Sequence, residues 1–214
     1  MSNASRFTDR TEAGEQLGKA LRERGIDVDI VLSIPRGGLP LGRAVADVLD
    51  VPLDIAVASK IGAPGNPEYA IGAVASDGSV WRNEEAFRGT GSDEEYFQRE
   101  REKEAANARK KADRYRDGRP EPDLSGMTVA VVDDGVATGS TARACLQKLE
   151  KSDAERLVLA VPVGPPGTID ELEGMVDDVV CLETPSGFRG VGQFYDRFDQ
   201  VTDEEAMAYL EAEE

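Results

Sequence analysis

Apolar runs of strand length alternate with segments of helical periodicity along most of the chain. The runs cover residues 28–34, 52–59, 128–132, 156–163 and 178–182. Apolar residues at helical spacing mark residues 9–25, 39–49, 141–150, 168–175 and the chain beyond Asp203. Uninterrupted apolar strands that alternate with helices are typical of a parallel sheet covered on both faces. The pattern therefore predicts an α/β fold.

The alternation is interrupted over residues 61–120. Two short apolar runs, 70–75 and 80–83, flank an Asp77-Gly78 pair, which favours a hairpin turn. Residues 93–115 are dense in Glu, Lys and Arg and predict a long solvated helix with charge pairs four positions apart. We expect this interruption to be an inserted flap, hairpin and long helix.

The chain has 214 residues, a formal charge of −17 and no histidine. Because no repeat or low-complexity linker divides it, we expect a single domain over residues 1–214. Histidine-based catalysis is excluded, and the acidic balance disfavours nucleic acid, whose phosphates bind basic patches. Most basic residues are Arg rather than Lys. This composition favours a halophilic protein, with an acidic protein of ordinary habitat as the alternative.

Two features predict where the protein works. No apolar run is long enough to cross a membrane, and the first residues lack the apolar centre of a secretion signal. Cys145 and Cys181 each lie in an apolar segment, which favours two buried free thiols over a disulfide. We therefore expect a cytoplasmic protein without a membrane partner.

The segment from Val129 to Arg143 has the composition of a sugar and phosphate site. An apolar strand ends in Asp133 and Asp134, and a turn of small and hydroxyl residues then opens a helix. Such a turn directs backbone N–H groups and partial positive charge at an anion. Carboxylates at the carboxyl end of a strand meet the ligand crevice of an open α/β sheet, where they can accept hydrogen bonds from sugar hydroxyls. The alternative is a plain helix N-cap.

The string VVDDGVATGST in this segment resembles the 5-phosphoribosyl 1-pyrophosphate (PRPP) signature of type I phosphoribosyltransferases. The resemblance implies a central parallel sheet of about five strands flanked by helices, with a small hood and an inserted flap and hairpin region. It also implies that Asp133 and Asp134 hold the ribose hydroxyls. The residues implied for the 5′-phosphate are Val136, Ala137, Thr138, Gly139, Ser140 and Thr141.

A second candidate anion loop, Pro35-Arg36-Gly37-Gly38, follows the first predicted strand. The glycines allow the backbone to approach an anion closely, and Arg36 adds charge and a forked donor. A plain turn is the alternative. In the family that the chain resembles, this loop binds pyrophosphate and often contains a cis peptide. The resemblance therefore implies a pyrophosphate site at these four residues, with a cis Pro35–Arg36 bond.

Lys60 lies where relatives carry a basic residue that reaches the pyrophosphate, and a strand-end lysine with no such role is the alternative. Residues 62–69 match a mobile flap of the family, whose closure would exclude water from the reacting centre. Glu68 is the carboxylate of that flap and a candidate acid/base, or else an exposed side chain without a role. Arg36, Lys60 and Glu68 form the candidate catalytic set.

Residues 183–196 resemble the part of hypoxanthine-guanine phosphoribosyltransferases in which an aromatic ring stacks on the purine. Phe188 is the matching residue for acceptor binding. In the alternative, Phe188, Phe194 and Tyr195 are core residues. Ala137 stands where those enzymes carry an acidic residue, and their purine-reading lysine has no match, so the resemblance does not name the acceptor.

Together these features predict a PRPP-dependent phosphoribosyltransferase, which is a pentosyl-transferring glycosyltransferase of nucleotide metabolism. It would move the 5-phosphoribosyl group to a nitrogenous acceptor, such as a nucleobase, and release pyrophosphate. The resemblance implies Mg²⁺ as cofactor, carried by PRPP near Asp133 and Asp134. PRPP and a small-molecule acceptor are the expected partners, without nucleic acid, and a homodimer is the assembly considered. The alternative function is a PRPP- or nucleotide-sensing regulator on the same fold.

Overall fold

The computed structural model describes residues 6–211, which group into two compact units. Of the described residues, the first unit contains those up to Ile55, Asp123–Thr138 and those from Asp153 onward. The second unit contains Ala56–Pro122 and Gly139–Ser152. None of the helices described for residues 6–211 has the length and apolar character needed to cross a membrane.

A five-stranded parallel sheet forms the centre of the first unit, in the order β2-β1-β6-β7-β8. Its strands are β1 (Ile30–Ser33), β2 (Leu53–Ile55), β6 (Thr128–Val132), β7 (Arg156–Val163) and β8 (Asp178–Glu183). Nearly every residue of β1, β6 and β7 is buried, because strands covered on both faces need apolar side chains on both. The predicted α/β fold with about five parallel strands is confirmed.

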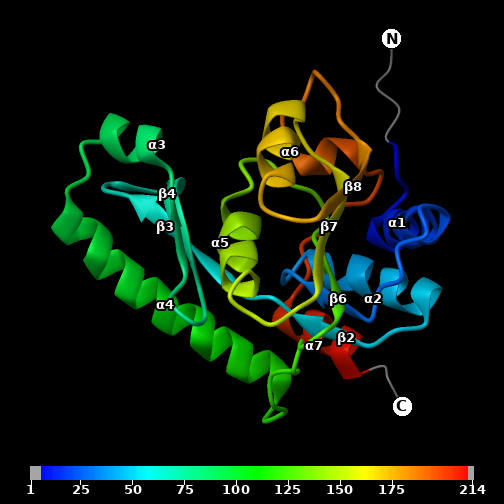
Figure 1. Ribbon diagram of the computed structural model, residues 1–214. Helices are drawn as coiled ribbons and strands as arrows, with labels where there is room; N and C mark the ends of the chain where they lie inside the picture. Colours follow the sequence, from blue (N-terminus) through cyan, green and yellow to red (C-terminus); the bar gives the residue numbers. More distant parts are fainter. Residues whose placement is uncertain (1–5, 212–214) are drawn as a thin grey trace. The chain divides into compact units, whose positions relative to one another are not determined.

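Helices flank this sheet, and the first two lie side by side (Figure 1). They are α1 (Arg10–Glu23), α2 (Gly38–Leu49), α6 (Pro166–Glu173) and α7 (Asp203–Glu211), with a 3₁₀ turn at Val191–Phe194. The carboxylate of Asp9 accepts a hydrogen bond from the Glu12 N–H at 3.0 Å, so α1 begins on a side-chain cap. Its first helical residue is Arg10.

The strand order reverses between β1 and β6. From β1 the chain passes through α2 to β2 on one side, whereas β6, β7 and β8 extend the sheet on the other. In open α/β sheets, ligands bind outside the carboxyl ends of the strands at such a switch point. The residues that follow β1 and β6 are therefore positioned to form a binding site.

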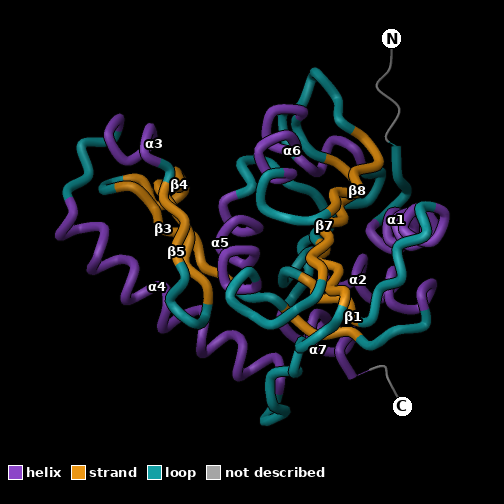
Figure 2. The backbone as a smooth tube through the Cα atoms, in the orientation of Figure 1, coloured by secondary structure: helices purple, strands orange, loops and turns teal. Residues whose placement is uncertain are grey.

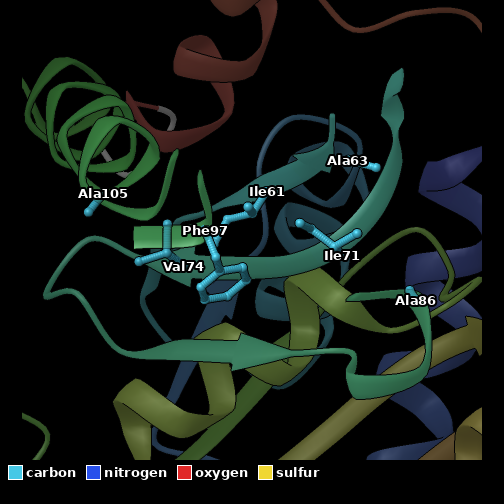
Figure 3. Packing of buried hydrophobic residues seen from close by; sticks show 7 residues of the cluster. All are labelled: Ile61, Ala63, Ile71, Val74, Ala86, Phe97 and Ala105. Atoms are coloured by element: carbon cyan, nitrogen blue, oxygen red, sulfur yellow. The ribbon is translucent and has the colours of Figure 1, made fainter. Parts of the chain in front are cut away.

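A three-stranded antiparallel sheet organises the second unit. The strands of this sheet are β3 (Ala58–Ala63), β4 (Asn66–Ala75) and β5 (Val80–Arg82). The helices of the unit are α3 (Glu84–Gly89), α4 (Glu94–Arg116) and α5 (Ser140–Leu149). Helix α4 runs along β3 and β4 (Figure 2). Ile61, Ile71, Val74 and Phe97 fill the core between them (Figure 3). The predicted hairpin and the long charged helix are confirmed.

Two predictions about the local structure are wrong. The apolar run 52–59 is not one strand: β2 ends at Ile55 in the parallel sheet, and β3 begins at Ala58 in the antiparallel one. Ala56 and Val57 between them are also buried, so the apolar pattern contains no sign of the break. Both cysteines are free as predicted, but only Cys145 is buried, and Cys181 is half-buried.

Candidate functional site

The Pro35-Arg36-Gly37-Gly38 loop leaves the carboxyl end of β1, and Asp133 and Asp134 leave the carboxyl end of β6. These are the two strands on either side of the switch point. The Pro35–Arg36 peptide bond is cis, as predicted. The Gly38 N–H then donates to the Ile34 carbonyl at 3.1 Å, which turns the chain into α2.

Gly37 and Gly38 pack directly against the two carboxylates. A Cβ atom on Gly37 would lie 2.1 Å from Oδ2 of Asp134. A Cβ atom on Gly38 would lie 3.3 Å from Oδ1 of Asp133 and 3.1 Å from the Val132 carbonyl oxygen. A side chain at Gly37 would displace the Asp134 carboxylate or the loop, so glycine at this position allows their close approach.

The two carboxylates are half-buried and close together. The Asp134 N–H donates to Oδ1 of Asp133 at 2.8 Å. Burial raises the pKa of Asp133 well above its ordinary value, and the charge of Asp134 raises it further. Burial also raises the pKa of Asp134, against the hydrogen bond and charge of Arg10, which lower it. Partial exclusion of water therefore favours the protonated form of both carboxyls more than bulk water would.

Arg10 is the counter-charge of this pair, and the sequence prediction missed it. Its Nε donates to Oδ2 of Asp134 at 2.8 Å, and the two side chains are only 11% and 14% exposed. One local signal could have indicated it. A cation in the first turn of a helix opposes the helix dipole, so an arginine directly after the Asp9 cap suggests an acidic partner elsewhere in the chain.

Some backbone groups of the proposed phosphate loop already form hydrogen bonds within the protein. The N–H of buried Val136 donates to the Val163 carbonyl at 2.9 Å, so this group is not available to an anion, and the prediction for Val136 needs this correction. The Ala137 carbonyl accepts a hydrogen bond from the Thr168 hydroxyl at 2.9 Å. Gly139 has a φ of 71°, a left-handed conformation that glycine adopts without strain, and it opens α5.

The remaining loop residues continue into this helix. Ser140 and Thr141 form its first turn, where backbone N–H groups have no intrahelical acceptor, and Thr138 precedes the cap. A cradle of N–H groups and hydroxyls over Ala137 to Thr141 has the composition needed for a phosphate.

Lys60 and Glu68 belong to the second unit, on β3 and β4. The Lys60 ammonium donates to Oε2 of Glu68 at 3.1 Å and to the Glu68 carbonyl at 3.1 Å. Glu68 is 89% exposed and Lys60 37%. The Tyr96 hydroxyl donates to the Gly62 carbonyl at 2.9 Å and ties α4 to the hairpin near its turn. Two of the three predicted catalytic residues, Lys60 and Glu68, are thus paired with each other on this hairpin.

Arg36 and Phe188 are the other predicted site residues, and both lie in the first unit. Arg36 is half-exposed, with Nη1 3.7 Å from Oδ1 of Asp203 at the start of α7. The half-buried Phe188 ring stacks on Phe194 with centroids 5.7 Å apart. Phe194 and Tyr195 are buried, so the core alternative holds for these two rings and not for Phe188.

The described residues alone offer few ligands for a metal ion. Among residues 6–211, no group of three or more Cys, Asp or Glu side chains is arranged to hold an ion. Asp133 and Asp134 are nevertheless hard oxygen ligands next to each other, of the kind that Mg²⁺ prefers. They suit an ion that keeps its waters and has other ligands.

Comparisons with known proteins point in the same direction as this geometry. A family model described as a phosphoribosyl transferase domain matches residues 10–197. Two Mycobacterium tuberculosis proteins, MT0597 and Rv0571c, are provisionally named phosphoribosyl transferases and are each 40% identical to the chain over 205 residues. That match covers 96% of this chain but 46% of each relative, so the chain spans about half their length.

A solved structure is similar over nearly the whole chain. The crystal structure of TT1426 from Thermus thermophilus has 40% sequence identity and a TM-score of 0.80. The match covers 96% of this chain and 97% of TT1426. Similarity of this extent includes both the parallel sheet and the inserted hairpin and helix.

Proposed function

Because this chain belongs to the type I phosphoribosyltransferase family, we propose that it transfers the 5-phosphoribosyl group of PRPP to a nitrogenous acceptor and releases pyrophosphate. One observation carries the proposal. Gly37 of the first loop touches Asp134 of the second at the switch point of the parallel sheet. In PRPP the ribose hydroxyls and the pyrophosphate are neighbouring groups, so one ligand would meet both loops.

Each loop has a separate task in this proposal. Asp133 and Asp134 accept hydrogen bonds from the ribose hydroxyls. The 5′-phosphate binds the N–H groups and hydroxyls from Ala137 to Thr141. The pyrophosphate binds the backbone from Pro35 to Gly38 and the Arg36 side chain, and Lys60 joins it when the hairpin closes.

The proposed reaction is a displacement at C1 of the ribose. The acceptor nitrogen forms a bond to C1, the bond from C1 to the pyrophosphate oxygen breaks, and its electron pair leaves with pyrophosphate. Arg36 and Lys60 stabilise the negative charge that develops on the leaving group. The proton of the acceptor nitrogen passes to the Glu68 carboxylate or to water. The protein acts by alignment and charge, without a nucleophile of its own.

Mg²⁺ carried by PRPP fits this site. The ion would supply charge neutralisation at the pyrophosphate. The Asp133 and Asp134 carboxylates are the residues that could share its coordination shell, since Mg²⁺ retains several waters and needs few protein ligands.

The acceptor is proposed to be a nucleobase or a related planar compound. One face of Phe188 is stacked on Phe194, and the ring is half-buried. Its other face could stack on a planar acceptor, which aromatic rings favour. A cytoplasmic location, a salt-rich habitat and a homodimer stay predictions, and the two free thiols agree with the first of them.

Pyrophosphate release tests the proposed function. The protein would be incubated with PRPP and Mg²⁺ in molar salt, with a panel of nucleobases offered one at a time. We expect release that depends on one acceptor or a small group of them. Binding of PRPP without release for any acceptor would contradict transfer and would favour a regulator that senses PRPP.

A further inference from the structure

Two residues far from Asp134 in the sequence, Arg10 and Tyr195, donate hydrogen bonds to it. From the N-terminal side, Arg10 donates from Nε to Oδ2 of Asp134 at 2.8 Å. From the C-terminal side, the Tyr195 hydroxyl donates to the Asp134 carbonyl oxygen at 2.6 Å. One contact fixes the carboxylate and the other fixes the backbone that carries it. Neither residue belongs to a motif of the proposed PRPP site.

Arg10 is itself held in place. Its Nη1 donates to the Asp199 carbonyl at 2.8 Å, and its guanidinium carbon lies 3.9 Å from the centre of the Phe198 ring. The side chain is 11% exposed. Because these two neighbours hold the guanidinium in place, it can keep the Asp134 carboxylate in one orientation. A flexible cation would move together with the carboxylate.

Tyr195 is held equally well. Its ring is buried between Phe7, at a centroid distance of 5.5 Å, and Phe198, at 5.0 Å. The backbone N–H of Asp196 donates to the Phe7 carbonyl at 2.9 Å. Burial raises the pKa of Tyr195, so its hydroxyl stays a donor at any physiological pH. We call Arg10, Tyr195 and Phe198 the Asp134 brace.

The brace determines which oxygens of the acidic pair a ligand meets. Oδ1 of Asp133 already accepts the Asp134 N–H, and Oδ2 of Asp134 accepts Arg10. The two carboxyl side chains also hydrogen-bond to each other, a contact that ligand hydroxyls would replace. Because a carboxylate has two acceptor oxygens, one oxygen of each could then accept a ligand hydroxyl. Two acceptors on adjacent residues match the two donors of a vicinal diol, provided that Asp134 does not rotate.

We propose that Arg10 is the positioning residue of the acidic pair, and that the Asp134 brace gives the site its selectivity for a vicinal diol. This inference rests on the proposed ribose site and adds to it a residue outside the PRPP motifs. Arg10 acts through Asp134 and does not touch the ligand. Loss of Arg10 would free Asp134 to turn and would remove the alignment of one acceptor with one hydroxyl.

Three sugar phosphates separate positioning from a general structural role. Calorimetry would give the affinities of the protein and of its Arg10→Ala variant for ribose 5-phosphate, 2-deoxyribose 5-phosphate and 3-deoxyribose 5-phosphate. We expect the unchanged protein to prefer ribose 5-phosphate over both analogues by about tenfold, the value of a hydrogen bond to a charged acceptor. In Arg10→Ala, the preference over one analogue should fall to within about twofold, and that analogue identifies the hydroxyl held by Asp134.

Arg197→Ala is the matched control. Arg197 has the same charge as Arg10 and lies next to Phe198 of the brace, but it is 66% exposed and pairs with Asp9 at 2.6 Å. It should keep both preferences. Arg10→Lys should recover part of the lost preference, because an ammonium keeps the charge without the fork that spans Asp134 and Asp199.

Tyr195→Phe keeps the packing of the ring and removes only the hydroxyl, so it tests the brace if Arg10→Ala does not fold. It should reduce the same preference as Arg10→Ala, by a smaller factor. If both variants keep both preferences, or if Arg10→Ala weakens all three ligands equally, the positioning role is wrong while the ribose site stands. If the unchanged protein prefers ribose 5-phosphate over neither analogue, the ribose site itself is wrong.

Discussion

Two regions carry charged residues of the proposed site, the acidic pair and the Lys60–Glu68 hairpin, and these regions are stabilised in opposite ways. At the acidic pair, Arg10 reaches Asp134 across 124 positions of sequence, and both side chains are nearly buried. On the hairpin, Lys60 pairs with Glu68 only 8 positions away, and Glu68 is 89% exposed. An exposed ion pair contributes about 0–1 kcal/mol, whereas a buried charge that loses its partner costs several times more.

This difference indicates which part of the site must exist before the ligand arrives. Ribose hydroxyls need acceptors that are already aligned, and alignment requires contacts from several parts of the fold. A weakly held hairpin can exchange its internal ion pair for an anionic ligand, as the proposed role of Lys60 requires. The acidic pair is therefore expected to be rigid and the Lys60–Glu68 hairpin adaptable.

The largest effect is expected from the acidic pair itself. The double variant Asp133→Asn, Asp134→Asn keeps the size of both side chains and removes their charge. Two charge-assisted hydrogen bonds to the ribose are weakened, so the affinity for PRPP should fall on the order of 1,000-fold. Calorimetry in molar salt with Mg²⁺ measures it. An unchanged affinity would refute the ribose site.

The variant Gly37→Ala should disturb the acidic pair without changing any charge. The added Cβ would lie 2.1 Å from Oδ2 of Asp134, so either the carboxylate or the loop must move. A displaced carboxylate would lose its hydrogen bond to the ribose, which is worth up to about 3 kcal/mol for a charged acceptor, so we expect PRPP binding to weaken on the order of 100-fold. Gly167→Ala in α6 is the control, because no atom lies within 4 Å of its added Cβ. Equal affinities in the two variants would show that the contact is irrelevant.

Lys60→Ala should affect only the pyrophosphate end. The affinity for PRPP should fall by about tenfold, the value of one hydrogen bond to a charged group, while that for ribose 5-phosphate stays the same. The melting temperature should change little, since the Lys60–Glu68 pair is exposed. Equal losses for the two ligands would mean that Lys60 does not reach the pyrophosphate.

The smallest effect concerns stability. Folding raises the pKa of Asp133 above its ordinary 3.8, so the folded chain keeps this proton at pH values where the unfolded chain has released it. Stability therefore falls as the pH rises through that interval. Asp133→Asn lacks this group and should be more stable at pH 7, by about 0.5–2 kcal/mol. Denaturant unfolding at several pH values measures the difference, which should shrink towards pH 4; a constant difference would contradict the assigned cause.

Much of the candidate site could be predicted from short contiguous segments of the sequence. The acidic pair, the loop after it and the Pro35-Arg36-Gly37-Gly38 loop are each contiguous, and their chemistry follows from residue types at the end of an apolar strand. The parallel sheet was predictable because β6 and β7 are apolar almost throughout.

The remaining features depend on contacts between distant segments. The Arg10–Asp134 and Tyr195–Asp134 contacts join residues 124 and 61 positions apart, and no local periodicity encodes them. The end of β2 at Ile55 was invisible because the buried run continues through Val57, and partners, not composition, separate the two strands. The use of the Val136 N–H by Val163 likewise appears only once β7 is in its position.

A crystal structure of the protein with PRPP and Mg²⁺ tests the central claim most directly. The account predicts ribose hydroxyls on Asp133 and Asp134, the 5′-phosphate along Ala137 to Thr141, and pyrophosphate on the backbone of Gly37 and Gly38, with Arg10 still bound to Asp134. A ligand bound elsewhere, with no hydroxyl on either carboxylate, would contradict it.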